Sequence, residues 1–389
     1  MWRYSLVFAI LSCCFGQTPK LHQDAFVMDG HVHMINRQFY LGGDIGDSYK
    51  DGQVDLPRIR RGGLKAIFFG LFSSEEYYPR RFELKHTLRL MDLALRQLEK
   101  NRDVMEVALR ASDIERINKT GKIAAVLDLE GGFDLDGDLG VLRNLYRLGL
   151  RSAMLVAHNF TNSFADSCCA PAKWNGINAH GRAVIAEMNR LGMVINVAHG
   201  SNETILQAAE ASRDPVLFSH GGSRHFVNTP RNLSDEAAAK IASKGGVIGL
   251  QFGNSFSNRE YFEWRQKGAP FGDVSGALKR YGVFETITAL DQAVAKTYPS
   301  EPRTAPEAMR MGIDRLVEVI DYWIKLVGED HVSLGSDFDG GPEPPRGMRD
   351  IGDYGQITDA MLRKGFSEQR IRKVLGLNLL RLFRQVTEK

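Results

Sequence analysis

Residues 123–132 read IAAVLDLEGG, a run of apolar side chains that ends in a carboxylate and two glycines. An aliphatic run of this length is typical of a strand that is buried on both faces of a parallel sheet. Similar runs recur along the chain and are separated by longer helical patterns. We expect eight strands, which lie at residues 26–30, 65–71, 123–129, 152–157, 193–198, 215–219, 246–252 and 332–336. Strands and helices that alternate in this way predict an α/β fold, the (β/α)8 TIM barrel.

The segments between these strands carry apolar residues at three- and four-residue spacing, for example at residues 84–100 and 313–326. This spacing predicts amphipathic helices that pack against the wall of the barrel. Residues 25–389 are therefore expected to form a single barrel domain. Two longer connections, residues 42–55 and 254–304, are expected to cover one end of it, because long ordered loops are often lids.

The bulk composition permits an enzyme. The chain has 389 residues and a formal net charge of +3 at pH 7. A chain of this length buries a full-sized core. A charge this small gives no support for nucleic acid as a partner.

Residues 1–17 are expected to be a signal peptide. Arg3 precedes a short apolar run, and small residues follow, which is the pattern of a secretory signal. The segment Ile10-Leu11-Ser12-Cys13 also has the form of a bacterial lipoprotein cleavage site, at which a lipidated Cys13 would tether the protein to a membrane. The sequence therefore predicts a secreted or periplasmic protein, or one held at the cell envelope.

Two cysteines remain in the expected mature domain, Cys168 and Cys169. Neighbouring cysteines rarely pair with each other. We therefore expect no structural disulfide framework.

Polar side chains that can bind metal ions or move protons stand at the ends of six of the eight expected strands. They are Asp29, His31, His33, Glu130, His158, His199, His220 and Asp337. One such histidine alone would more often be a buried, hydrogen-bonded residue than a ligand. The C-terminal ends of the strands of a barrel meet at one mouth, however, so the joint placement predicts a single site there.

The spacing of these residues favours a binuclear metal site. His31 and His33 leave the same face of a strand and can reach one ion together. Glu130 is placed to bridge two ions, and His199 and His220 would complete the second position. Ligands of this kind without thiolates suit zinc, so we expect two divalent metal ions, above all Zn2+, with manganese, cobalt or iron as substitutes.

A site of this kind predicts a metal-dependent hydrolase that uses metal-activated water. Asp337 is the candidate for moving the proton to the leaving group, and Asp339 nearby is expected to be a loop residue. His158 could polarise the scissile carbonyl and stabilise the oxyanion. The alternative for His158 is a packed histidine at the end of a strand.

Several segments together resemble the membrane (renal) dipeptidase family of zinc metallopeptidases, within the amidohydrolase group of barrels. They are MDGHVH (28–33), the stretch from LDLEGG to ADSC (127–168), INVAHGS (195–201), VLFSHGGSR (216–224), TPRNLSDE (229–236), VSLGSDFDGG (332–341) and KVLGLNLLRLF (373–383). The resemblance implies a zinc dipeptidase, and it implies the following roles: a bridging glutamate at Glu130, histidine ligands at His31, His199 and His220, a catalytic aspartate at Asp337 and a substrate-contacting histidine at His158.

The resemblance also implies that Arg231 binds the free carboxylate of a dipeptide. A guanidinium can hold a carboxylate through two hydrogen bonds and would select substrates with a free C-terminus. Arg224 and His225 are rival residues at the mouth. A solvated loop arginine before a helix cap at Ser234 is the structural alternative for Arg231.

One motif departs from the family. The family usually has His-x-Asp where this chain has His31-Val32-His33, and the exchange makes the site more positive by about one charge. The pattern of other amidohydrolase barrels favours, as an alternative, hydrolysis of another amide or lactone bond, such as that of an N-acyl amino acid or a cyclic amide. A barrel that binds metal or peptide without turnover is the third alternative. The sequence leaves a homodimer open.

Overall fold

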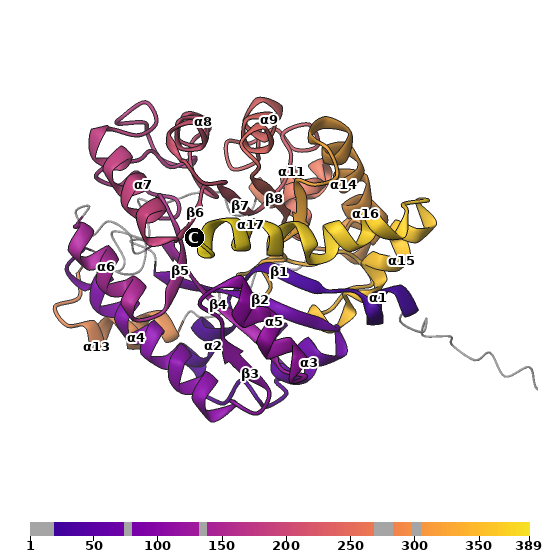
Figure 1. The fold of residues 1–389 in the computed structure, drawn as a ribbon, viewed down its shortest axis with the longest axis horizontal. Coiled ribbons are helices and arrows are strands. Elements are labelled where there is room, and N and C mark those ends of the chain that lie inside the picture. Colours follow the sequence, from indigo (N-terminus) through magenta and orange to yellow (C-terminus); the bar gives the residue numbers. More distant parts are fainter. Residues whose placement is uncertain (1–18, 74–79, 132–137, 268–282, 297–304) are drawn as a thin grey trace, which may run out of the picture.

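The computed structural model describes residues 19–73, 80–131, 138–267, 283–296 and 305–389. In these parts the chain forms one sheet of nine parallel strands surrounded by helices (Figure 1). The strands are β1 Val27–Val32, β2 Leu64–Ser73, β3 Met105–Val107, β4 Ile123–Gly131, β5 Leu150–Met154, β6 Val194–Asn196, β7 Leu217–Gly221, β8 Val247–Leu250 and β9 Val332–Leu334.

Eight of these strands follow one another around a near-closed barrel, in the order β1-β2-β4-β5-β6-β7-β8-β9. The chain after β9 returns to the end of β1, where Asp337 N donates to His31 O at 2.9 Å and His33 N donates to Phe338 O at 2.9 Å. The predicted barrel is confirmed. The additional strand β3 pairs with β4 outside this path, and the sequence did not reveal it because only three residues form it.

The helices cover the outside of the sheet. They are α1 Lys20–Asp24, α2 Met34–Leu41, α3 Leu56–Arg61, α4 Arg80–Lys100, α5 Ala111–Lys119, α6 Leu139–Arg147, α7 Ala179–Leu191, α8 Asn202–Ala211, α9 Asp235–Ser243, α10 Asn254–Ser257, α11 Arg259–Gln266, α13 Ile287–Ala295, α14 Ile313–Val327, α15 Gly355–Arg363, α16 Glu368–Arg372 and α17 Asn378–Thr387. The two helices predicted from spacing are present as α4 and α14. In α14 the buried residues Leu316, Ile320 and Trp323 recur at that spacing, which places one apolar face on the barrel.

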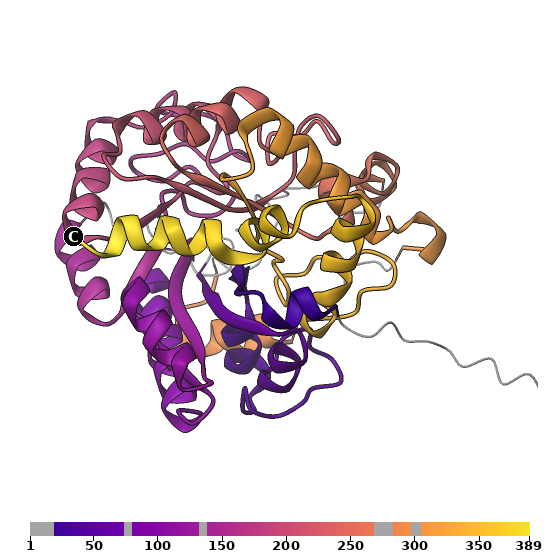
Figure 2. The same ribbon diagram turned by 45° about the vertical axis from the view of Figure 1, so that its right-hand side comes forward.

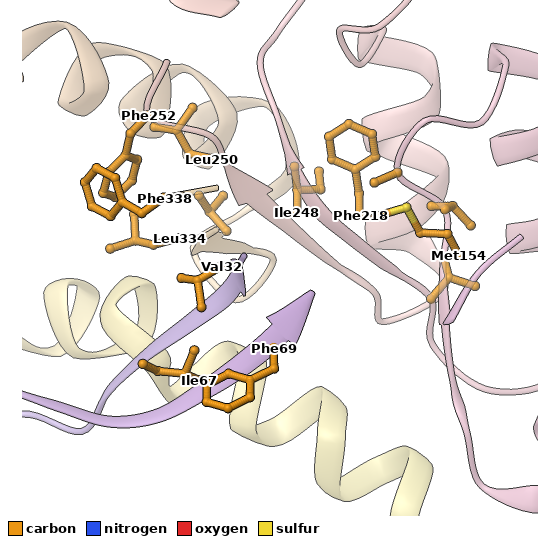
Figure 3. Close-up of a cluster of buried hydrophobic side chains, with 14 of the residues drawn as sticks. Val32, Ile67, Phe69, Met154, Phe218, Ile248, Leu250, Phe252, Leu334 and Phe338 are labelled. Carbon is orange, nitrogen blue, oxygen red and sulfur yellow. The ribbon is translucent and has the colours of Figure 1, made fainter. Parts of the chain in front are cut away.

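The core lies between the strands and these helices. Figure 3 shows part of it, where side chains from β1, β2, β5, β7, β8 and β9 meet. The interior of the barrel leaves no room for a side chain at two glycines. A Cβ would lie 1.9 Å from Ser219 O if added at Gly249, and 2.0 Å from it if added at Gly335. Strands packed this closely hold the polar residues at their ends in fixed positions.

One end of the barrel is covered by α17, which lies across the middle of the view in Figures 1 and 2. Leu382 and Phe383 of this helix are buried against Met28 of β1 and Phe68 of β2. The chain enters the helix through Gly376, where a Cβ would lie 2.6 Å from Phe26 O. These apolar contacts between α17 and the strands therefore close the end of the barrel that lies opposite the C-terminal ends of the strands.

Of the two predicted long connections, residues 42–55 are fully described and residues 254–304 only partly. Residues 254–304 contain α10, α11 and α13, whereas residues 268–282 and 297–304 lie outside the described parts. The predicted signal peptide and Cys13 also lie outside them. Within the described ranges, no helix combines the length and the apolar character needed to cross a membrane.

Candidate metal centre

Seven of the eight polar residues predicted at the strand ends meet at the mouth of the barrel. They are His31 at the end of β1, His33 directly after it, Glu130 in β4, His158 after β5, His199 after β6, His220 in β7 and Asp337 after β9. His31, Glu130 and His220 are no more than 2% exposed. The eighth, Asp29, instead joins β1 to the chain after β9, because its carboxylate accepts from Ser336 N at 3.0 Å.

Glu130 lies at the middle of this group. Its Oε2 is 2.9 Å from Nε2 of both His31 and His33. Its Oε1 is 3.1 Å from Nε2 of His199 and 3.6 Å from Nε2 of His220. Each carboxylate oxygen therefore faces one pair of imidazoles, which is the arrangement expected of a carboxylate between two ions.

The outer nitrogens of three of these imidazoles are held by neighbouring side chains. The partners are Asp128 Oδ2 at 3.2 Å from His31 Nδ1, Asn159 Oδ1 at 3.2 Å from His199 Nδ1, and Ser219 Oγ at 2.9 Å from His220 Nδ1. Partners of this kind fix the orientation of a ligating imidazole. Sequence reasoning missed all three, although Asp128 stands two residues before Glu130 and so on the same face of β4.

These residues fit a metal site. Ligand atoms of His31, Glu130 and His220 lie within 4.8 Å of one another, and so do those of Glu130, His158 and His199. His31 Nε2 and His33 Nε2 are 3.0 Å apart. Imidazole nitrogens gathered around one buried carboxylate form a donor set that suits a divalent ion.

The pKa values differ between the two sides of Glu130. Burial lowers the pKa of His33, but the Glu130 carboxylate outweighs that effect and raises the pKa to about 9. Burial lowers the pKa of His199 and of His220 well below the usual value, and Arg231 adds to the effect. Burial raises the pKa of Glu130, but His31 and His33 lower it well below the usual value. The glutamate is therefore ionised and one imidazole pair is neutral.

Asp337 lies at the edge of the centre. Its Oδ1 is 3.0 Å from His33 Nε2, and its Oδ2 accepts a hydrogen bond from Gln251 Nε2 at 2.9 Å. Gln251 follows β8, and sequence reasoning assigned no polar residue to the end of that strand. An amide side chain indicates a functional site less strongly than a carboxylate or an imidazole does. Gln251 nevertheless stands directly after its strand, as the predicted site residues do.

Three residues of the site have a left-handed backbone. The φ angles are 56° at His158, 63° at His199 and 61° at Asp337. Such values are uncommon for residues other than glycine and are found at functional positions. The ring of His158 lies 4.2 Å from that of His199 and 4.9 Å from that of Phe72, and burial lowers its pKa to about 4.

Arg231 faces the centre from the loop before α9. It is 4% exposed, and its Nη2 donates to His199 Nε2 and to His220 O, both at 3.0 Å. Its Nε and Nη1 have no hydrogen-bond partner among the described residues. Burial lowers its pKa to about 10, so the guanidinium stays charged at neutral pH.

The rival residues at the mouth are engaged elsewhere. Arg224 Nε donates to Asn232 O at 2.9 Å, and the ring of His225 stacks on Tyr322 at 4.2 Å. Ser234 caps α9, as expected, by accepting from Ala237 N at 3.1 Å. Asp339 accepts from Gln53 N at 2.6 Å and so ties the 42–55 connection to the loop after β9.

One expectation was wrong. Cys168 and Cys169 form a disulfide with each other. They lie in a turn, where neighbouring side chains do not alternate between two faces as they do in a strand. The turn touches the site, because Cys168 N donates to His199 O at 2.8 Å and Ser167 Oγ donates to His158 O at 2.8 Å.

The family model described as "Membrane dipeptidase (Peptidase family M19)" matches residues 16–389. Among curated proteins, the chain is similar to "Dipeptidase tcpJ" of Claviceps purpurea, with 28% identity over 376 residues that cover 92% of this chain and 77% of the relative.

Solved structures show the same fold. The probable dipeptidase PvdM from Pseudomonas aeruginosa superimposes with a TM-score of 0.74 at 24% identity, covering 95% of this chain and 97% of that one. A metallo peptidase from Rhodobacter sphaeroides, liganded with a phosphinate mimic of the dipeptide L-Ala-D-Ala, superimposes with a TM-score of 0.73 at 23% identity, covering 93% of this chain and 100% of that one.

Proposed function

Because the chain belongs to the membrane dipeptidase family of metallopeptidases, peptidase family M19, and is a dipeptidase of that family, we propose that it hydrolyses dipeptides at the centre around Glu130 with two divalent metal ions, above all Zn2+. The observation that carries this proposal is the position of Glu130, with one pair of imidazoles on each of its carboxylate oxygens.

The metal ligands in this proposal are His31, His33, Glu130, His199 and His220. Divalent ions bound there would polarise the scissile carbonyl and lower the pKa of an attacking water. The imidazole at His33 replaces the aspartate that is usual in the family, and its Nε2 faces Glu130 in the same way as that of His31. We therefore propose that the exchange keeps the ligand position.

Substrate binding would use Arg231 and His158. Two guanidinium donors of Arg231, Nε and Nη1, have no partner among the described residues, and we propose that one of them donates to an oxygen of a free C-terminal carboxylate. His158 has its pKa lowered to about 4, so the imidazole is neutral and can donate one hydrogen bond to the oxygen of the scissile carbonyl as negative charge develops there.

Asp337 would move the proton. In this scheme its carboxylate takes a proton from the attacking water and gives it to the nitrogen of the leaving amine as the peptide bond breaks. Gln251 holds Asp337 Oδ2 at 2.9 Å, which leaves Oδ1 toward the centre.

Removal of the central carboxylate tests the proposal. Glu130→Gln keeps the volume and removes the charge, so metal content should fall together with turnover, by on the order of 10³-fold in kcat/KM. Metal per chain is measured by plasma mass spectrometry on dialysed protein, with His220→Ala as the second variant and Glu263→Gln, an exposed carboxylate on α11, as control. A Glu130→Gln protein that keeps both metal and turnover would refute the scheme.

The substrate is tested separately, on wild-type protein with and without added zinc. We expect cleavage of L,L and L,D dipeptides and no cleavage of an N-acetylated dipeptide or a simple lactone. Turnover of the blocked peptide or the lactone would mean that His33 changes the substrate class while the metal centre is retained.

We further propose that residues 25–389 act as one domain outside the cytoplasm, in the periplasm, secreted or at the cell envelope. The support is the pattern of residues 1–17, with Arg3 before a short apolar run. Mass analysis of the mature N-terminus tests it. A diacylglyceryl group on Cys13 would mean a tethered protein, a start near Gln17 a free one, and an intact Met1 would contradict export.

A further inference from the structure

One buried amide contacts two of the groups that hold the proposed metal ligands. Asn196 is the last residue of β6, and it is 0% exposed. Its Nδ2 donates to Asp128 Oδ2 of β4 at 3.3 Å and to Ser219 Oγ of β7 at 2.8 Å. Asp128 and Ser219 in turn hold the outer nitrogens of His31 and His220. Because β5 separates β4 from β6 in the sheet, the bond to Asp128 crosses the interior of the barrel.

The orientation of this amide follows from the backbone around it. Asn196 Oδ1 accepts hydrogen bonds from Ala198 N at 3.1 Å and from Ser219 N at 3.3 Å. A backbone N–H group can only donate, so the oxygen of the amide must face these two nitrogens. The opposite orientation would direct an NH2 group at two donors. Nδ2 is therefore fixed on the side of Asp128 and Ser219 Oγ, and both of its protons are used there.

The contact with Asp128 bears on His31. A carboxylate only accepts hydrogen bonds, so His31 Nδ1, which lies 3.2 Å from Asp128 Oδ2, carries a proton, and Nε2 is the nitrogen left for an ion. Asp128 Oδ1 is buried and has no hydrogen-bond partner among the described residues. Apart from the histidine itself, Asn196 is thus the group that orients this carboxylate.

The contact with Ser219 bears on His220. Ser219 Oγ lies 2.9 Å from His220 Nδ1. The bond from Asn196 fixes the place of this oxygen and leaves one lone pair and the hydroxyl proton for the imidazole. The rings of His31 and His220 stack, with centroids 4.0 Å apart and planes at 15°. One amide therefore supports two adjacent imidazoles that face different oxygens of Glu130.

We propose that Asn196 is a positioning residue that strengthens metal binding on both sides of Glu130 at once. It acts through Asp128 on the His31 side and through Ser219 on the His220 side. This inference rests on the proposed function, because it takes the two histidines as metal ligands. Loss of a group that orients a ligating imidazole typically weakens metal binding by about 10–100-fold. Loss of a group shared by two such ligands should weaken both ions.

Zinc affinity tests this role. Asn196→Leu keeps a similar side-chain shape and removes both donors. Metal per chain is measured by plasma mass spectrometry over a series of free zinc concentrations set by a chelator. We expect the free zinc needed to load each of the two ions to rise by about 10–100-fold. Dipeptide turnover should recover at saturating zinc, because all the proposed ligands remain in the chain.

The matched control is Asn189→Leu in α7. Asn189 is also a buried asparagine, 5% exposed, whose Nδ2 donates to Ser212 Oγ at 3.1 Å and whose Oδ1 accepts from Arg213 N at 2.7 Å. The control removes the same kinds of hydrogen bond from another part of the fold, so it should keep the zinc affinity of the wild type. An equal loss of affinity in both variants would make Asn196 a structural residue and overturn the proposal.

Two further variants keep the test decisive if Asn196→Leu does not fold. Asn196→Ala removes the amide without placing an apolar group against Asp128, and it should weaken both ions as well. Ser219→Ala removes one branch only, so it should weaken one ion and leave the other unchanged. The proposal is overturned if the Asn196 variants load zinc as the wild type does, if they weaken one ion only, or if turnover does not return when both ions are bound.

Failure of the proposed function is recognised separately, on the wild-type protein. A wild type that loads two zinc ions but cleaves no dipeptide would refute the function, and the zinc affinities of the variants would still decide the role of Asn196. A wild type that loads no zinc would refute both.

Discussion

At the end of the barrel that α17 covers, Met28, Phe68, Leu382 and Phe383 are buried against one another, whereas at the opposite end the strands deliver imidazoles and carboxylates to one point. Both ends contain buried side chains, since Phe383 is 0% and Glu130 2% exposed. The two ends differ in the chemistry of their buried side chains, which are apolar at the α17 end and ionisable at the mouth.

Burial of apolar side chains stabilises the fold, whereas burial of ionisable groups costs free energy unless they are paired. The left-handed backbone of His158, His199 and Asp337 adds a further cost at the mouth. The α17 end therefore supplies stability, and the mouth uses part of that stability for chemistry. Substitutions at the two ends should separate these properties.

The largest expected effect is on stability at the α17 end. Phe383→Ala removes a ring that lies 5.7 Å from that of Phe68, and we expect the free energy of unfolding to fall by about 3–5 kcal/mol. The kcat/KM of the folded fraction should stay within about twofold, because the ring is remote from the centre. Urea unfolding and the dipeptide assay on one preparation measure both quantities.

Arg384→Gln is the matched control at this end. Arg384 stands on the outer face of the same helix and pairs with Glu115, and both side chains are about half exposed. We expect a change below about 1 kcal/mol in stability. If Phe383→Ala lowered turnover of the folded protein as strongly as it lowered stability, the separation of the two ends would be wrong.

The second prediction concerns the mouth. Asparagine tolerates the left-handed backbone found at His158, so His158→Asn keeps the local conformation and removes the imidazole. We expect kcat to fall on the order of 10²–10³-fold, while the metal content is retained. Steady-state kinetics and metal analysis check this. A variant with full kcat would make His158 a packing residue, which is the alternative reading of the sequence.

The same contrast explains how much of the molecule the sequence could predict. The barrel was predictable because each main strand is an apolar run between helical patterns. The proposed ligands were predictable because imidazole and carboxylate groups are rare within such runs, and His31, Glu130 and His220 each follow one. These patterns are local in the sequence, so they can be recognised without knowing which distant residues each side chain contacts.

Other features depend on contacts between distant segments. Asn159 becomes a partner of His199 only because the two loops adjoin, and Gln251 reaches Asp337 across the gap between β8 and β9. The position of α17 over the end of the barrel likewise depends on its contacts with β1 and β2. The Cys168–Cys169 bond needs a turn that no spacing rule predicts.

The third prediction uses the disulfide between Cys168 and Cys169. A bond between neighbouring residues closes a minimal loop, so reduction should change the free energy of unfolding little. The turn contacts the backbone of His158 and His199, so we expect kcat/KM to fall roughly fivefold, about 1 kcal/mol. Assays with a phosphine reductant and on the Cys168→Ser/Cys169→Ser protein should agree. Equal kinetics in both states would show that the bond plays no part at the mouth.

The smallest effect is expected on the outer wall, which belongs to neither end. Glu187 of α7 pairs with Arg190 at 2.7 Å and with Arg143 of α6 at 3.1 Å, and these hydrogen bonds lower its pKa to about 2. Both arginines are more than a third exposed, so solvent screens the pairs and their contribution is discounted to about 1 kcal/mol. Glu187→Gln should therefore lose about that much stability at pH 7 and low salt.

The sign of the pH dependence follows from the lowered pKa. A carboxyl whose pKa is lower in the folded state stabilises the protein above its unfolded pKa, about 4.5, and this contribution is lost as the pH falls toward about 2. The difference in stability between wild type and Glu187→Gln should therefore shrink across that window, and it should also shrink in 1 M salt, where the Debye length is about 3 Å. Denaturant unfolding at several pH values measures it, with Glu263→Gln as control. A difference that stays constant with pH would assign the effect of Glu187 to packing, and the outer wall would then resemble the α17 end more than an ionic surface.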